Sequence, residues 1–315
     1  MILIATNRGD YTADFLILKF QERDIDYLRF NTEDFPFSAP ASLTPEGGTV
    51  ILEKAGKRFD LSEVTGVWYR RPEGPSFPAD FDPQMHDFVN RECREFLQGI
   101  WRSINCSFVN HPDKIRLAEN KIEQLGRMNK MGFQIPDTLV TNDPKAAMKF
   151  YDSHGGEIIA KTLRASHGQM GKQEYVIYTN SVSKEHLSLI DSVRLSPVIF
   201  QEKVKKMSDI RVTVVDHHVF STEIFSQNSP STEIDWRRDT LSLKHVPHSL
   251  PHQIERACIN LVQAYGLVFG TLDLIRRESG DYVFLELNPN GQWAWIESLT
   301  GQPISDKLIE VLTRG

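Results

Sequence analysis

The sequence has no long apolar run. No stretch approaches the ~18 consecutive apolar residues that a membrane-spanning helix needs. The N-terminal segment, MILIATNRGD, is apolar only briefly, and it lacks the basic stretch and long apolar core of a secretory signal. We therefore expect a cytoplasmic protein without a membrane partner.

Cysteine is scarce. The chain has three cysteines, Cys93, Cys106 and Cys258, and none of them stands in a CxxC pair. An odd number without such spacing argues against a disulfide framework and against a zinc site. A reducing compartment is the simpler interpretation.

An excess of positive charge is also missing. The net charge is −6 at pH 7, and the isoelectric point is near 5.9. Non-specific binding to nucleic acid needs basic surface that displaces counterions, so we expect no nucleic-acid partner. Internal repeats and low-complexity tracts are absent as well.

The chain does have enough length and apolar content for more than one core. With 315 residues, 40% of them apolar, it is long enough for two or three domains. Asn110-His111-Pro112 interrupts the pattern and marks a first boundary. We predict an N-terminal α/β domain at 1–110, a central subdomain at 111–196 and a C-terminal subdomain at 197–315.

The order of the predicted elements indicates an α+β protein with an α/β start. A buried strand at 2–5 precedes a helix at 13–21, and a single helix is expected over 114–131. Towards the C-terminus, antiparallel strands are expected at 209–215, 219–225, 267–275 and 283–287. Strands and helices are mixed without strict alternation, which is typical of α+β folds.

Two carboxylates lie inside the last two apolar strands. Asp273 stands in GTLDLI and Glu286 in VFLELN, and the turn RRESGD separates them. Adjacent antiparallel strands would bring the two side chains opposite each other, and Asn288 would project from the same face as Glu286. Buried carboxylates need a partner or a metal, and three oxygen ligands suit Mg²⁺. The alternative is that the acids face solvent and Asn-Pro only ends a strand.

The lysines and a glycine-containing loop are weaker signals. Lys161 lies in the apolar strand EIIAKT, where an anion would have to compensate a buried charge, and Lys121 follows Asn120. The stretch RASHGQMGK at 164–172 could offer backbone N–H groups to phosphate, but it lacks Walker A spacing. A solvated lysine and a plain surface hairpin are the simpler alternatives.

Polar side chains also cluster after the strand VIFQEKV. Gln201, Glu202 and Val204 end this strand, and Asp209 and Arg211 share one face of the next. The segment IDWRRD adds a pair of arginines, Arg237 and Arg238, whose planar guanidinium groups suit phosphate and carboxylate. The alternative is a set of surface ion pairs.

Taken in chain order, these residues resemble the ATP-grasp superfamily across roughly residues 111–300. In that family two lysines contact the nucleotide, a glycine-rich loop closes over the phosphates, and a Q-E-x-x strand lines adenine. The resemblance implies that ATP and Mg²⁺ are the cofactors. It implies these contacts: nucleotide at Lys121, Lys161, Gln201, Glu202 and Val204; ribose at Asp209; Mg²⁺ at Asp273, Glu286 and Asn288; γ-phosphate or acceptor carboxylate at Arg211 and at Arg237 or Arg238.

The stretches VWYRRP (67–72), NHPDKIRLAENK (110–121) and LELNPNGQWAWIE (285–297) narrow the resemblance. They look like the ATP-grasp peptide maturases of the microviridin type, which make graspetides. This resemblance covers nearly the whole chain. It implies a ligase that activates Asp or Glu side chains of a ribosomally made precursor, with leader and core, as acyl phosphates. Thr, Ser or Lys side chains of the same peptide would then close ester or amide rings.

Other interpretations share the same residues. A glutamate or amino-acid ligase acting on a protein tail or small molecule would have an identical ATP site, and a non-catalytic ATP-binding regulator is a more remote alternative. The family also implies a homodimer. Trp68 is expected in a core, whereas Arg70 and Arg71 beside it could lie on the surface or face the substrate.

Overall fold

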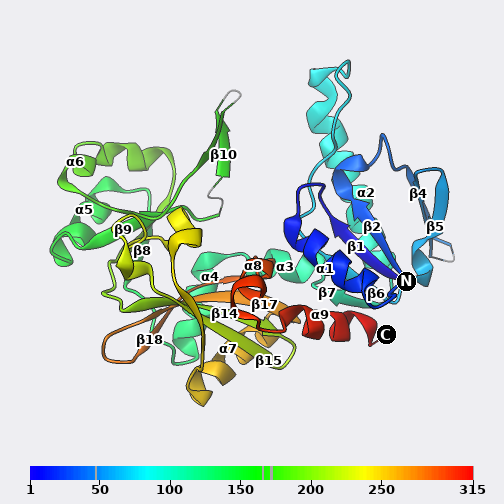
Figure 1. Ribbon diagram of the computed structural model, residues 1–315. Coiled ribbons are helices and arrows are strands. Elements are labelled where there is room, and N and C mark those ends of the chain that lie inside the picture. The colour runs from blue at the N-terminus through cyan, green and yellow to red at the C-terminus, as the bar shows by residue number, and fades with distance from the viewer. Residues whose placement is uncertain (47, 165–166, 171–172, 315) are drawn as a thin grey trace.

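The structure is a computed structural model that describes residues 1–46, 48–164, 167–170 and 173–314. Helices and sheets are mixed along the chain, so the predicted α+β class is confirmed (Figure 1). Within these ranges no helix has the length and apolar character to cross a membrane.

The N-terminal part contains a parallel sheet with strand order β2-β1-β6-β7. Because β1 is followed by β2 on one side and β6 lies on its other side, the carboxyl ends of β1 and β6 are neighbours at the point where the strand order reverses. A small antiparallel sheet, β3-β4-β5, lies beside it. The elements of this part are β1 (Ile2–Thr6), α1 (Tyr11–Gln21), β2 (Tyr27–Asn31), β3 (Ala41–Thr44), β4 (Thr49–Lys54), β5 (Lys57–Asp60), β6 (Gly66–Tyr69), α2 (His86–Ser103) and β7 (Ser107–Val109).

The central part is a four-stranded antiparallel sheet with the order β12-β9-β13-β8, from which a two-stranded hairpin, β10-β11, projects (Figure 1). Its core is small and includes Ala147, Ile158, Val182, Val193 and Phe200. The elements are β8 (Thr138–Thr141), α5 (Pro144–Ser153), β9 (Ile158–Lys161), β10 (His167–Met170), β11 (Gln173–Val176), β12 (Asn180–Ser181), α6 (Lys184–Leu187) and β13 (Val198–Glu202).

The C-terminal part is a five-stranded antiparallel sheet with the order β16-β15-β14-β17-β18. All of β14 and nearly all of β17 are buried, because helices cover this sheet. The predicted antiparallel strands are confirmed. The elements are β14 (Ser208–Val215), β15 (His218–Ile224), β16 (His245–His248), α7 (His252–Ala264), β17 (Phe269–Arg276), β18 (Tyr282–Asn288), α8 (Ala294–Thr300) and α9 (Ile304–Thr313). Short 3-10 turns lie at Thr32–Asp34, Leu61–Glu63, Pro83–Met85, Ile190–Leu195, Ser226–Asn228 and Trp236–Ser242.

The prediction of a single helix over 114–131 is wrong. The structure has two helices, α3 (Pro112–Ala118) and α4 (Lys121–Lys130). The side chain of Asn120 accepts the N–H groups of Ile122 and Glu123, so it caps the second helix and separates it from the first. This break places Lys121 in the first turn of α4.

Packing follows the sheets rather than the order of the chain. Strand β13 pairs with β8 and β9, so the predicted limit at residue 196 cuts through the central sheet. Helices α3 and α4 contribute Ile115, Leu125 and Met128 to the core of the C-terminal sheet. Helix α9 returns to the N-terminal sheet and packs against β6 and β7 (Figure 1). Domains defined by which sheet a segment packs on therefore differ from the predicted domains, which are continuous stretches of the chain.

Candidate active site

A cleft of about 500 Å³ lies between the central and C-terminal sheets. All but two of the predicted site residues line it, and the exceptions are Arg211 and Arg238. The predicted residues that line the cleft are Lys121, Lys161, Gln201, Glu202, Val204, Asp209, Arg237, Asp273, Glu286 and Asn288.

The predicted oxygen cluster is present on the C-terminal sheet. Asp273 of β17 pairs directly with Glu286 of β18, and the register shifts just after Asp273. The amide nitrogen of Asn288 lies 3.4 Å from Asp273 Oδ2 and 3.3 Å from Glu286 Oε1. The NH₂ group of Asn288 thus faces both carboxylates. A cation at this position would be stabilised by the same two negative groups. Rotation of this amide would present its oxygen, so the donor set of two carboxylates and one amide fits Mg²⁺.

The two carboxylates have opposite pKa shifts. Burial tends to raise the pKa of Glu286, but the positive charges of Lys121, Lys161 and Arg237 outweigh burial and lower it to about 2. Burial raises the pKa of Asp273, although the Arg211 charge opposes this. Glu286 is therefore ionised across the neutral range, and its negative charge adds to the cost of ionising Asp273.

Two lysines approach this acidic pair from the other elements. Lys121 Nζ lies 3.2 Å from Glu286 Oε2 and 3.4 Å from the carbonyl oxygen of Thr162. Lys161 stands at the end of β9, and burial lowers its pKa to about 8, against the charge of Glu286. The cleft therefore combines two carboxylates that suit a metal ion, Asp273 and Glu286, with two lysines that suit phosphate, Lys121 and Lys161.

The central sheet supplies the opposite wall. Gln201 is fully buried, and its side chain donates to the Thr138 hydroxyl at 2.8 Å. Among the described residues its Oε1 has no hydrogen-bond partner. Glu202 forms an ion pair with Arg277 at 3.6 Å, and Val204 follows at the edge of the cleft.

Asp209 begins the C-terminal wall. Lys206 Nζ lies 2.7 Å from its Oδ2, and the Ser226 hydroxyl donates to the same oxygen. Burial raises the pKa of Asp209, although Lys206 opposes this shift. Lys206, which is not among the residues predicted from the sequence, also lines the cleft.

The three predicted arginines occupy different environments. Arg211 is buried, and its Nη1 lies 2.9 Å from both oxygens of Asp273. Arg237 lines the cleft and reaches to 3.9 Å from Glu286 Oε1. Arg238 instead donates to Asn180 and lies over the ring of Tyr178. The structure thus separates the two arginines that the sequence left as alternatives.

Asp235 lines the cleft but is not among the residues predicted from the sequence. Its carboxylate accepts hydrogen bonds from Arg237 Nε at 2.8 Å and Nη2 at 2.6 Å, and from the backbone N–H of Thr179 at 3.2 Å. It therefore fixes the Arg237 side chain and links the 3-10 turn at Trp236–Ser242 to the end of the central sheet. The spacing Asp-x-Arg in IDWRRD was the available signal.

The segment Asn290–Trp295 in NPNGQWAW follows the predicted metal ligands Glu286 and Asn288. Together with Pro289 before it, this segment contacts three parts of the molecule. The side chain of Asn110 donates to the carbonyl oxygens of Phe269 and Pro289 and accepts from the backbone N–H groups of Val268 and Phe269, where β17 begins. Trp293 is fully buried against Phe15 and Trp68 of the N-terminal domain. The residues predicted to end a domain, around Asn110, are therefore part of the support of the site.

The glycine-containing loop at 164–172 falls partly outside the described residues. What is described are the strands β10 and β11 on either side of residues 171 and 172, paired in an antiparallel hairpin. A phosphate contact from this loop stays a prediction.

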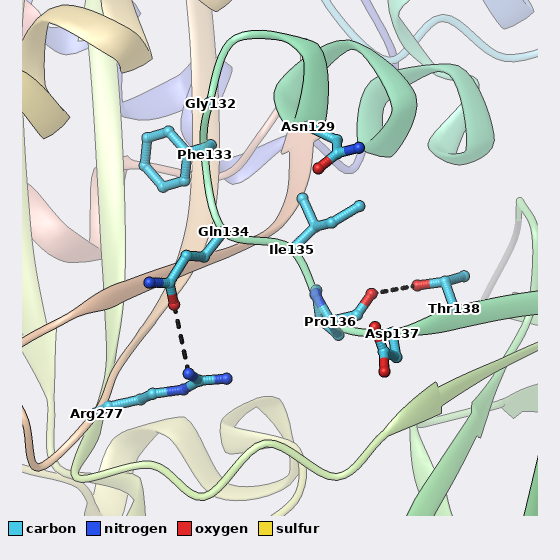
Figure 2. Close-up of a pocket in the computed structure, with 9 residues that line it drawn as sticks. All are labelled: Asn129, Gly132, Phe133, Gln134, Ile135, Pro136, Asp137, Thr138 and Arg277. Carbon is cyan, nitrogen blue, oxygen red and sulfur yellow. Dashed lines mark hydrogen bonds between the residues drawn. The ribbon is translucent and has the colours of Figure 1, made fainter. Parts of the chain in front are cut away.

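A second cavity, of about 580 Å³, lies next to the cleft, with which it shares Pro136. Figure 2 shows its lining by the segment between α4 and β8, with Arg277 donating to Gln134 Oε1 at 3.3 Å. Arg277 also pairs with Glu202, so this ion pair connects the lining of the second cavity to that of the cleft.

Comparison with known proteins shows the family to which the chain belongs. Residues 1–116 match the family described as MvdD pre-ATP grasp domain, and residues 118–312 match the RimK-like ATP-grasp domain. The fold and the cleft thus define an ATP-grasp enzyme. The chain belongs to the RimK-like ATP-grasp family, whose members use ATP.

The most informative similarities to solved structures span the whole chain. A Chryseobacterium gregarium RiPP-associated ATP-grasp ligase, solved with ADP and a leader and core peptide, is 32% identical over 99% of this chain and 96% of its own, with a TM-score of 0.91. Macrocyclase MdnC of Microcystis aeruginosa MRC, bound with precursor peptide MdnA, is 28% identical over 100% of this chain and 99% of its own, with a TM-score of 0.89.

A curated relative is a glutamate ligase, which is the alternative function considered from the sequence. Glutamate–LysW ligase ArgX of Sulfolobus acidocaldarius is 24% identical over 217 residues, which are 68% of this chain and 75% of the relative. The whole-chain similarity, including the N-terminal domain, identifies the protein as an ATP-grasp ligase of the graspetide maturase type.

Proposed function

We propose that this ligase uses Mg²⁺-ATP to close rings in a ribosomally made precursor peptide that has a leader and a core. A carboxylate oxygen of an Asp or Glu side chain attacks the γ-phosphorus of ATP, and ADP leaves. A Thr or Ser hydroxyl, or a Lys amine, of the same peptide then attacks the acyl carbon, and phosphate leaves as the ester or amide forms. The observation that carries the proposal is the 32% identity over 99% of the chain to a ligase solved with such a peptide.

The proposed roles follow the walls of the cleft. On the C-terminal wall, Asp273, Glu286 and Asn288 would hold Mg²⁺, which would neutralise the phosphate charge. Arg237, which lines the cleft, and Arg211, which binds the cleft residue Asp273 without lining the cleft itself, would hold the γ-phosphate or the acceptor carboxylate. The contact of Arg238 with Asn180 supports Arg237 as the second arginine.

The remaining roles concern the nucleotide. Lys121 and Lys161 would bind phosphate, and Asp209 would hold the ribose. The central wall would contact adenine through Gln201, Glu202 and the backbone of Val204. All these residues line the cleft.

The chemistry needs little from the protein beyond positioning and charge. The peptide supplies both the carboxylate and the second nucleophile, so the site needs no covalent nucleophile of its own. The two lysines and the one arginine around Glu286, Lys121, Lys161 and Arg237, match this requirement, because they would stabilise negative charge on a phosphate that is being transferred.

An amino-acid ligase is the second candidate function. It is favoured by the similarity to glutamate–LysW ligase ArgX, which covers 68% of this chain. The N-terminal domain separates the two candidates, because residues 1–116 match the MvdD-type domain.

The test is a mass measurement on a candidate precursor. A short neighbouring reading frame with repeated Thr and Glu or Asp would supply the peptide. Incubated with the enzyme, ATP and Mg²⁺, it should lose one water for each ring, and omission of ATP should prevent the loss. ATP consumption only with free glutamate or another small acceptor would instead support the amino-acid ligase.

A homodimer is also proposed from the resemblance. Sedimentation of the purified protein at several concentrations measures the mass in solution directly. A monomer at every concentration would remove this part of the proposal.

A further inference from the structure

Arg70 is a buried arginine at the carboxyl end of β6, far along the chain from the cleft residues. Its side chain is 1% exposed. Its Nε donates to Asp10 Oδ2 at 2.8 Å, its Nη1 to the carbonyl oxygen of Gly291 at 3.2 Å, and its Nη2 to Gln292 Oε1 at 2.8 Å. The Arg70 guanidinium therefore connects the N-terminal sheet to Gly291 and Gln292, which follow the predicted metal ligands Glu286 and Asn288 of β18.

Asp10 fixes one end of this connection. Its Oδ1 accepts the N–H groups of Thr12 and Ala13 as the cap of α1, and its Oδ2 accepts from the Thr6 hydroxyl as well as from Arg70. A buried ion pair is tolerated when further hydrogen bonds satisfy it, and here they do. The position of Arg70 is therefore set by the first strand and helix of the chain.

Gln292 fixes the other end. Its side-chain oxygen accepts from Arg70 and from the Thr12 hydroxyl, and its backbone carbonyl accepts from Arg211 Nη2 at 3.2 Å. Arg211 Nη1 in turn binds Asp273. A continuous set of contacts thus joins the N-terminal domain to Arg211 and Asp273.

The contact between Arg211 and Gln292 matters because Arg211 has few others. Among the described residues its Nε has no hydrogen-bond partner. The plane of the guanidinium therefore depends on Nη1 at Asp273 and Nη2 at the Gln292 carbonyl. Loss of the second contact would leave Arg211 free to rotate about the first.

The backbone next to Gln292 is held very close to the same arginine. A Cβ added at Gly291 would lie 1.6 Å from the Thr271 hydroxyl oxygen and 2.8 Å from Arg211 Nη2. Only glycine allows this approach. The backbone at Gly291 is therefore packed directly against the side chains of Thr271 and Arg211.

We propose that Arg70 and Gln292 are positioning residues for the ligase reaction: they hold the Gly291–Gln292 backbone, and through it the Arg211 guanidinium, at the angle that the transferred phosphate or the acceptor carboxylate requires. This inference rests on the proposed role of Arg211. It assigns to the N-terminal domain a part in the geometry of the catalytic cleft. Neither residue has to touch ATP or peptide.

The test replaces Gln292 with two residues of similar size. Gln292→Glu keeps an oxygen that can accept from Arg70 and Thr12, whereas Gln292→Met removes it. With the precursor and saturating Mg²⁺-ATP, Gln292→Met should lower kcat for ring formation by roughly tenfold to a hundredfold. Gln292→Glu should recover most of the rate. The KM for ATP should change by less than about twofold in both, because the nucleotide contacts are intact.

The double variant Asp10→Asn with Arg70→Gln gives a second measurement, since it removes both charges of the buried pair together. Its kcat should fall in the same way as that of Gln292→Met. Arg102→Gln is the matched control, because Arg102 forms an exposed ion pair with Asp113 away from the cleft. Thermal unfolding and ADP affinity are measured for every variant.

Equal rates for Gln292→Met and the wild type would overturn the inference, as would a loss that Gln292→Glu does not recover. A fall in kcat that only follows a fall in ADP affinity or in melting temperature would also overturn it. If the wild type forms no ring with any precursor, the proposed function has failed instead. The same comparison is then made on the hydrolysis of ATP without peptide, in which the proposed contact of Arg211 with the γ-phosphate would also act.

Discussion

The two walls of the cleft differ in how they are supported. On the C-terminal sheet, all of β14 and nearly all of β17 are buried, and apolar side chains of helices α3, α4 and α7 share one large cluster with them. The central sheet has a small core and is edged by the two-residue strand β12. The same nucleotide would therefore lie between a deeply packed wall and a lightly packed one.

The chemistry of the two walls follows this difference. The C-terminal wall holds Asp273, Glu286 and Asn288, together with the buried pair of Asp273 and Arg211. Metal ligands and phosphate-binding arginines must be placed within fractions of an ångström, which a rigid core allows. The central wall offers Lys161, Gln201 and Glu202, whose long side chains suit recognition of a nucleotide. We therefore expect changes on the C-terminal wall to affect catalysis and changes on the central wall to affect ATP affinity.

Glu286→Gln should have the largest effect. It removes the negative charge that Lys121, Lys161 and Arg237 surround, and with it a proposed Mg²⁺ ligand. Ring formation should fall by about a thousandfold or more, whereas leader-peptide binding should be largely unchanged. Peptide mass spectrometry measures the first and calorimetric titration the second. Full activity of the variant would refute the metal assignment.

Arg237→Lys should have the next largest effect, and Arg238→Lys is its matched control. A lysine cannot reproduce the two hydrogen bonds from the arginine fork to Asp235, so kcat should fall roughly a hundredfold. Arg238 points to Asn180, and its replacement should change kcat by less than about twofold. Steady-state rates at saturating ATP decide the comparison. Equal losses in both variants would contradict the separation of the two arginines.

Lys161 should make ATP affinity depend on pH. Burial lowers the pKa of the free lysine to about 8, so its charge is present below this pH and is lost above it. Bound phosphate favours the charged form, which raises the pKa in the complex. The affinity should therefore fall above pH 8, by at most about tenfold per pH unit, with uptake of a proton. Calorimetry across this range tests it, and Lys161→Arg, which stays charged, should remove the slope. A flat wild-type profile would count against a phosphate contact.

Gln201→Leu should have the smallest effect. The leucine keeps the volume of the buried side chain, which lines the cleft, but loses Oε1, which has no hydrogen-bond partner among the described residues. ATP affinity should fall roughly fivefold to tenfold, as expected for one hydrogen bond, and kcat should be nearly unchanged. Competition between ATP and a fluorescent nucleotide measures the affinity. A fall in kcat at saturating ATP would show that the central wall also affects catalysis.

Much of the site could be predicted because it follows from local patterns. Asp273 and Glu286 stand inside apolar strands on either side of a short turn, so hairpin pairing brings them together almost inevitably. Lys161 could be recognised by its apolar surroundings in the same way. By contrast, the choice between Arg237 and Arg238 depends on contacts with Asp235 and Asn180, which no periodicity shows.

The division into domains shows the same limit. A break at Asn110-His111-Pro112 is visible in the sequence, but the amide of Asn110 binds backbone groups of β17 and Pro289, more than 150 residues away. Helix α9 likewise packs on the first sheet of the chain. Contacts of this kind depend on the complete fold and leave no local signal.

The segment NPNGQW shows where the two kinds of information meet. The amino-acid sequence alone determined the strand, the predicted oxygen ligands and the resemblance to a class of ligase, because alternation and motif spacing are local properties of the chain. Only the tertiary structure decided why Gly291, Gln292 and Trp293 follow those ligands. They fit between Arg70, Arg211 and Trp68, which come from other sheets and strands, and such packing exists only after the sheets have assembled.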